Sequence, residues 1–114
     1  MVLLKSKDAY RLWLKIERDL PKVERLGIGN KIDSTFLEFL EILFVSSYTA
    51  LDKKLLLLGQ AMSKHDSLKF FCQIAWENKL IHTSKYSELS AHLEEIGRML
   101  GGWRKGLQTK LPAN

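Results

Sequence analysis

The sequence is poor in cysteine and proline, and it contains no long uninterrupted apolar segment. Its single cysteine, Cys72, has no disulfide partner in the chain and no CxxC neighbour, and one thiol is too few for a cysteine-rich zinc site. Because Cys72 lies between Phe71 and Ile74, we expect a buried, unreactive thiol. A lone cysteine agrees with a reducing cytoplasm.

The chain also lacks a recognisable targeting or membrane segment. "MVLL" at the start is soon followed by lysines, so it is too short for the apolar core of a signal peptide. The most apolar region, 42–58, is interrupted by two serines, an aspartate and two lysines, which is unlike a membrane span. We therefore expect a soluble cytoplasmic protein that does not enter a membrane. With two prolines and no repeat or linker, the 114 residues are expected to form one domain.

Helical periodicity dominates the rest of the sequence. The apolar spacing predicts four helices, over 7–20, 31–48, 52–80 and from 85 onward. Pro21 ends the first helix, and "KVERLGIGN" turns the chain with Gly27 and Gly29 free to adopt left-handed backbone angles. Thr83 or Ser84 is expected to cap the last helix. Because the connections are short, we predict an all-α fold, an up-down-up-down antiparallel four-helix bundle.

The second predicted helix is apolar on two sides. Leu37 and Phe44, seven residues apart, form an additional apolar face, so this helix is either central in the fold or part of an oligomer contact. Gly59, in the third helix, either kinks that helix or lets a neighbour approach. The main apolar face of the second helix consists of Ile32, Phe36, Phe39, Leu40, Leu43 and Ser47.

Positive charge is concentrated at the two ends of the chain. The net charge is +5, and residues 1–31 hold eight Lys or Arg against four acids, whereas 32–84 hold five against six. From Gly97 onward there are Arg98, Arg104, Lys105 and Lys110 and no acid. This distribution suits a polyanionic partner.

The first helix carries the most regular basic pattern. At 100° per residue its cations fall within about 40° of one line, although the break at Pro21 separates the last two from the others. Aligned cations suit contacts with successive phosphates, which give salt-dependent, sequence-tolerant affinity. The alternative is a solvated helix face whose charge serves solubility. The predicted nucleic-acid contacts are Lys7, Arg11, Lys15, Arg18, Lys22, Arg25, Arg98, Arg104 and Lys105.

Catalytic and metal-binding patterns are missing from the sequence. None of the histidines, His65, His82 and His92, follows a carboxylate at the Glu-x-x-His spacing of di-iron bundles, and no phosphate-binding loop or nucleophile elbow is present. We expect His65 and His92 on helix surfaces and His82 in an exposed turn. We therefore predict no enzyme activity, no metal and no cofactor.

The last helix contains an unusual number of glycines. "EIGRMLGGWRKG" holds four, and each costs about 1 kcal/mol relative to alanine inside a helix. Gly97 and Gly101, four apart, flank the stripe that includes Trp103 and are expected to let another backbone pack closely. Gly102 and Gly106 have no such explanation. A rival possibility ends the helix at Gly101 or Gly102 and leaves a basic tail.

The same stretch carries a family resemblance. "KYSELSAHLEEIGRMLGGW", together with "YRLWL", "LPKVERLGIGNKI", "LEFLEILFVSSYT" and "ENKLIHTSKY", resembles the accessory variability determinant proteins of diversity-generating retroelements, within a wider group of bacterial four-helix-bundle proteins. The resemblance implies a homopentamer that binds a reverse transcriptase and nucleic acid and supports mutagenic reverse transcription of a template RNA, without catalysis of its own. The third helix departs from the family by being poor in arginine. A stand-alone structural or protein-interaction bundle with no reverse transcriptase partner therefore remains the alternative.

Overall fold

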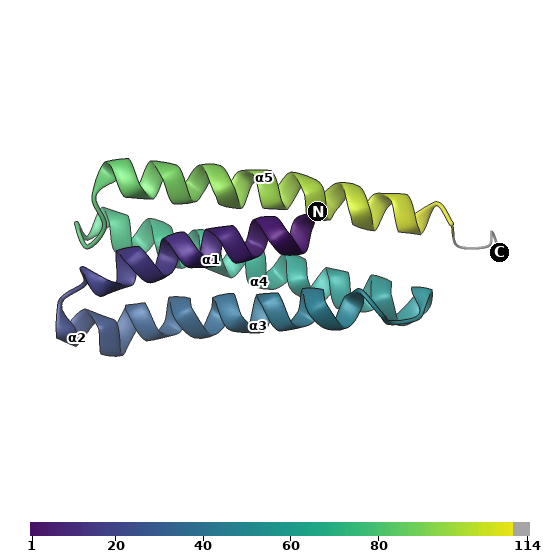
Figure 1. Ribbon diagram of the computed structural model, residues 1–114, viewed down its shortest axis with the longest axis horizontal. Coiled ribbons are helices and arrows are strands. Elements are labelled where there is room, and N and C mark those ends of the chain that lie inside the picture. The colour runs from purple at the N-terminus through teal and green to yellow at the C-terminus, as the bar shows by residue number, and fades with distance from the viewer. Residues whose placement is uncertain (111–114) are drawn as a thin grey trace.

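The computed structural model describes residues 1–110 and consists of four long helices that lie side by side (Figure 1). The molecule is elongated, with extents of 52 × 22 × 21 Å. No strand occurs in residues 1–110, so the predicted all-α fold class is confirmed. The elements are α1 (Val2–Arg18), α2 (Lys22–Glu24), the π-helical turn η1 (Arg25–Gly29), α3 (Asn30–Ser46), α4 (Leu51–Glu77) and α5 (Thr83–Gln108).

The helices pack around one core. Helix α3 packs on α4, α4 on α5 and α5 on α1, with a smaller contact between α1 and α3. In Figure 1 the α1–α3 and α4–α5 connections lie at one end, and the α3–α4 connection lies at the other. The core is filled by large side chains that each helix contributes from one face, including Trp13, Phe36, Phe39, Leu58 and Ile96.

The main face of α3 is largely as predicted. Ile32, Phe36, Phe39 and Leu43 are buried, and Leu40 is partly buried. Ser47 is exposed, which corrects its placement on the buried face. The reason is that α3 ends at Ser46, whose own hydroxyl is buried and donates a hydrogen bond to the Ile42 carbonyl at 2.7 Å.

The first helix begins earlier than predicted, at Val2 instead of residue 7. Val2 and Ser6 are buried, and the Ser6 hydroxyl donates to the Val2 carbonyl at 2.7 Å. The buried serine therefore satisfies its polar group within the helix. Tertiary packing of the first turn, which the lysines around it obscured in the sequence, sets this boundary.

The connection between α1 and α3 also differs from the prediction. It is mostly helical, and neither glycine has a positive φ: Gly27 has φ −100° and ψ −105°, and Gly29 is helical. Gly29 is needed for close packing instead. A Cβ there would lie 3.1 Å from the Glu24 carbonyl oxygen and 3.1 Å from Leu20 Cδ1.

In the connection between α4 and α5, α4 ends in a Schellman motif. The Leu80 amide donates to the Ala75 carbonyl and the Lys79 amide to the Trp76 carbonyl, both at 2.9 Å, with Lys79 in the left-handed region at φ 62°. Helix α5 then starts without a side-chain cap, which corrects the prediction for Thr83 and Ser84. The Thr83 hydroxyl instead accepts a hydrogen bond from Trp76 Nε1 at 3.1 Å.

Candidate nucleic-acid interface

Helix α1 is strongly amphipathic in the structure. Ala9, Trp13 and Ile16 are buried against the other helices, while the cations at positions 7, 11, 15 and 18 are all exposed. Over the rise of an α-helix, Lys7 to Arg18 spans about 16 Å. We call Lys7, Arg11, Lys15 and Arg18 the α1 basic line.

Few acids neutralise the α1 basic line. Arg11 Nη1 lies 3.5 Å from Asp8 Oδ1, in a pair that is exposed on both sides. Among residues 1–110, no carboxylate lies within 4.0 Å of the side-chain nitrogens of Lys7, Lys15 or Arg18. An exposed pair such as Arg11–Asp8 contributes at most about 1 kcal/mol and breaks readily. All four cations are therefore available to a polyanion.

Two carboxylates, Asp33 and Glu17, lie where α1 meets α3. The Tyr10 hydroxyl donates to Asp33 Oδ1 at 2.8 Å, and burial together with this carboxylate raises the pKa of Tyr10 to about 12. Burial and repulsion from Asp33 also raise the pKa of Glu17, and Arg25 opposes that rise. Arg25 is thus close enough to Glu17 to offset part of its charge.

Lys22 and Arg25 do not extend the α1 basic line as one helix. Helix α1 ends at Arg18, Pro21 is extended with ψ 150°, and Lys22 and Arg25 belong to α2 and η1. Both side chains are exposed, at the end of the molecule where the chain turns towards α3 (Figure 1). They add positive charge beyond the last turn of α1.

The predicted cations of α5 form a separate group. Lys5 Nζ lies 3.5 Å from Glu95 Oε1, which places the start of α1 level with the middle of α5. Arg104 and Lys105 therefore lie beyond the N-terminus of α1, along the part of α5 that extends past it in Figure 1. Arg98 is exposed. The pKa of the Glu94 carboxyl is lowered mainly by the hydrogen bond and charge of Lys69, and in smaller part by the charge of Arg98.

Arg104 is placed differently from the other cations. Its side chain is partly buried against α4, with Nη1 3.6 Å from Met62 Sδ. A Cβ on Gly59 would lie 3.5 Å from Arg104 Nη2, an ordinary van der Waals contact, so the packing of Arg104 does not require glycine at this position. Arg104 thus packs between helices instead of projecting freely as a phosphate contact.

The glycines of α5 separate into two kinds. A Cβ on Gly97 would lie 2.8 Å from His65 Cε1, so Gly97 provides close packing, although against an imidazole and not a backbone. A Cβ on Gly101 would meet nothing within 4 Å, and the same holds for Gly102 and Gly106. The close-packing role predicted for Gly101 is therefore wrong within the described chain. Helix α5 continues to Gln108, so the prediction that it ends at Gly101 or Gly102 is excluded.

The predicted oligomer residues lie at the surface. Leu37 is 48% exposed and Phe44 is 56% exposed, and Phe44 packs edge-on against the exposed Tyr48. Trp103 is partly buried, with Lys54 Nζ 6.0 Å from its ring centroid. The second apolar side of α3 thus faces away from the core.

The sequence predicted the burial of Cys72 but not that of His65. Cys72 is buried and burial raises its pKa to about 12, as expected for an unreactive thiol. His65 was predicted on a helix surface, which is wrong: it is only 6% exposed, and its Nε2 lies 2.6 Å from the Leu93 carbonyl oxygen. The signal for this placement was Gly97, whose missing side chain leaves room for the ring. His82, by contrast, is exposed beside the α4–α5 turn.

Within residues 1–110, no three His, Cys, Asp or Glu side chains come together as a metal site. None of the described helices is both long and apolar enough to cross a membrane.

No protein-family model matches the chain, and a search of curated proteins gives no match either.

Proposed function

We propose that this protein is a non-enzymatic nucleic-acid-binding bundle that serves as the accessory protein of a diversity-generating retroelement. In this role it holds template RNA or complementary DNA and the retroelement reverse transcriptase. The up-down-up-down topology expected from the short connections fits the placement of those connections in Figure 1 and belongs to the same proposal. The role in a retroelement rests on the resemblance of "EIGRMLGGW" and the other quoted segments.

The observation that carries nucleic-acid binding is the exposure of the α1 basic line. Its four cations project from one helix over about 16 Å. One strand of a duplex presents a phosphate every 3.4 Å or so along the axis, so this length matches about five phosphates. Contacts of this kind hold a nucleic acid without reading its bases, which suits a protein that accompanies a polymerase along a template.

Self-association through α3 completes the proposal. Leu37 and Phe44 form an apolar surface on an otherwise polar helix side, and a homopentamer would cover it. Ring assembly also repeats the α1 basic line, so that several short contacts act together on one polymer.

A mobility-shift gel tests the nucleic-acid assignment. Reversal of all four charges, with Lys7→Glu, Arg11→Glu, Lys15→Glu and Arg18→Glu, is expected to abolish retention of labelled RNA and DNA. Retention as strong as that of the unaltered protein would refute the assignment. Incubation with the labelled RNA should leave it uncut, because the proposal includes no catalysis.

A protein-interaction bundle is the second candidate, and the exposed apolar residues of α3 favour it. In that case the positive charge serves solubility. The two candidates differ at low salt: the first predicts binding of nucleic acid that falls steeply as salt rises, and the second predicts none.

A further inference from the structure

Helix α1 fills its position in the bundle over only part of the length of α5. It has 17 residues against 26 in α5, or about 25 Å against 39 Å at 1.5 Å per residue. The Lys5–Glu95 pair sets the two helices level, so α5 continues beyond Met1 from about Met99 onward. Beyond the start of α1, α4 and α5 continue beside the last turn of α3 and the α3–α4 connection (Figure 1). Among residues 1–110, no helix occupies the fourth position over roughly 14 Å, or two to three helical turns.

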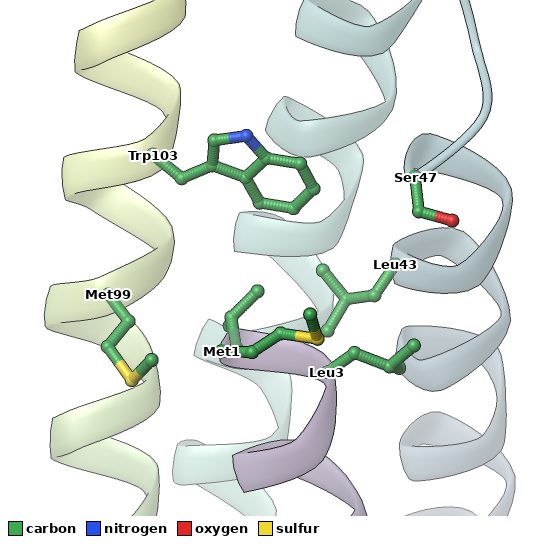
Figure 2. Close-up of a pocket in the computed structure, with 7 residues that line it drawn as sticks. Met1, Leu3, Leu43, Ser47, Met99 and Trp103 are labelled. Atoms are coloured by element: carbon green, nitrogen blue, oxygen red, sulfur yellow. The ribbon is translucent and has the colours of Figure 1, made fainter.

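An apolar groove of about 410 Å³ lies where α1 would continue. Leu43 of α3 and Ser47, just after the end of α3, line one side, and Met99 and Trp103 of α5 line the other. Figure 2 shows the Trp103 ring reaching from α5 across α4, with the first turn of α1 closing the groove at its lower end. The groove is thus lined by the end of α3 on one side, by α5 on the other and by the first residues of α1 at one end.

The surroundings of the groove carry excess positive charge. Lys54 Nζ lies 6.0 Å from the centroid of the Trp103 ring, and α5 has only basic charges from Gly97 onward. Helix α1 starts at the groove with no side-chain cap, so its first amide groups and the positive end of its dipole face this space. Of the acids in these elements, Glu41 and Asp52 are exposed, and Glu95 Oε1 lies 3.5 Å from Lys5 Nζ.

We propose that the groove binds a short amphipathic helix of a partner protein, with an apolar face that packs on Trp103 and Met99 and with acidic residues beside it. Such a helix completes the four-helix arrangement by laying its apolar side into a preformed groove. The carboxylates of this partner helix lie near Lys54 and the uncapped start of α1. This surface is distinct from the α1 basic line and does not depend on nucleic-acid binding.

A second copy of the chain fits the groove less well. Every long helix of a second copy is already packed in its own bundle. The α1 surface of that copy would also bring its four cations against the same positive charge. An acidic helix of another protein brings no cations to the groove and does not have to leave a bundle of this chain.

A designed peptide provides the probe. It is a stapled helix of about 14 residues, because shorter unconstrained helices are marginal in water, with leucines at i, i+3, i+4 and i+7 and glutamates flanking them. We expect the acidic peptide to shift the emission of Trp103 to shorter wavelength, and the shift to be absent in Trp103→Phe. A matched peptide with lysine in place of each glutamate is expected to bind at least about tenfold more weakly.

Variants of the protein locate the site. Ser47→Trp fills the groove and is expected to abolish peptide binding, whereas Ser87→Trp, at an exposed position of α5 far from the groove, leaves it unchanged. Lys54→Glu weakens binding without filling space, so it keeps the test decisive if Ser47→Trp does not fold. A variant with the α1 basic line replaced by glutamine should bind the peptide normally, which separates this inference from the proposed function.

Three results would overturn the inference. Equal binding of the acidic and basic peptides would remove the charge argument. Unchanged binding to both Ser47→Trp and Lys54→Glu would place the peptide elsewhere. A change in the oligomeric mass caused by Ser47→Trp would show that a second copy, and not a partner helix, occupies the groove.

Discussion

A missing side chain at Gly97 shapes the middle of the bundle. The His65 ring occupies the space that a Cβ would take, and it approaches the Leu93 carbonyl one turn earlier on α5. A buried polar ring that keeps its hydrogen bond avoids the desolvation cost of an unpaired group, which is about 1 to 3 kcal/mol. Gly97 therefore lowers the helix propensity of α5, but it leaves the space that the His65 ring needs.

Alanine at two glycines of α5 should have opposite effects. Gly97→Ala forces a Cβ to 2.8 Å from His65 Cε1 and is expected to destabilise the fold by about 1 to 3 kcal/mol. Gly101→Ala meets open space and should stabilise it by about 0.5 to 1 kcal/mol, because alanine is the better helix former. Urea unfolding measures both; stabilisation by Gly97→Ala would contradict the packing described for His65.

The Tyr10–Asp33 hydrogen bond predicts an alkaline titration. The pKa of Tyr10 in the folded state is about 12, above its ordinary value of 10.0. Because the folded state holds the proton more tightly, the stabilisation is complete below pH 10 and is lost as pH rises towards 12. Absorbance of ionised tyrosine should show one group titrating near pH 12 that is absent in Tyr10→Phe. Asp33→Asn should lower that pKa, and an unchanged value would contradict the role of Asp33.

At the scale of elements, the spacing of apolar residues in the sequence located the helices but not the residues at which they begin and end. The stripes that include Phe36, Phe39, Leu93 and Ile96 identified α3 and α5 correctly, because burial of one face depends on spacing alone. The start of α1 depends on how Val2 and Ser6 pack against other helices, which local sequence does not encode. The same limit explains why His65 was misplaced.

The end of α4 offers a test of how the chain turns. Lys79 has φ 62°, a backbone conformation that costs a residue with a Cβ roughly 1 kcal/mol or more. Lys79→Gly is expected to stabilise the protein by about 0.5 to 1 kcal/mol, since glycine adopts this conformation without strain. Asn78→Gly, one residue earlier at φ −91°, should not stabilise it. Thermal unfolding compares the two, and a loss of stability with Lys79→Gly would contradict the turn geometry.

At the scale of the whole molecule, charge and apolar surface are segregated. The basic line lies on α1, an exposed apolar surface lies on α3, and a groove opens beyond the start of α1. The sequence predicted the basic line from spacing, and it left the second apolar side of α3 either central in the fold or in an oligomer contact. It did not predict the groove, because the groove arises from the unequal lengths of α1 and α5 and from their register, which only the packed structure defines.

Self-association through α3 is testable by mass. Light scattering is expected to give about five times the 13.2 kDa chain mass, and Leu37→Glu with Phe44→Glu should reduce it to that of one chain by placing charges on the proposed contact. The control, Leu56→Glu with Phe70→Glu, changes two exposed apolar residues of α4 and should leave the mass unaltered. A single-chain mass for the unaltered protein would contradict the assembly.

The most direct test of nucleic-acid binding by α1 is the salt dependence of RNA affinity in two matched variants. One variant replaces Lys7, Arg11, Lys15 and Arg18 with glutamine, and the other replaces Lys31, Lys53, Lys79 and Lys85, four exposed cations elsewhere, so that both lose the same net charge. Four phosphate contacts correspond to a slope of about −3 in log affinity against log salt. The α1 variant is expected to lose about 3 from the slope of the unaltered protein, while the control variant keeps nearly all of it. Equal slopes for the two variants would contradict the account, because binding would then follow net charge and not the basic line of α1.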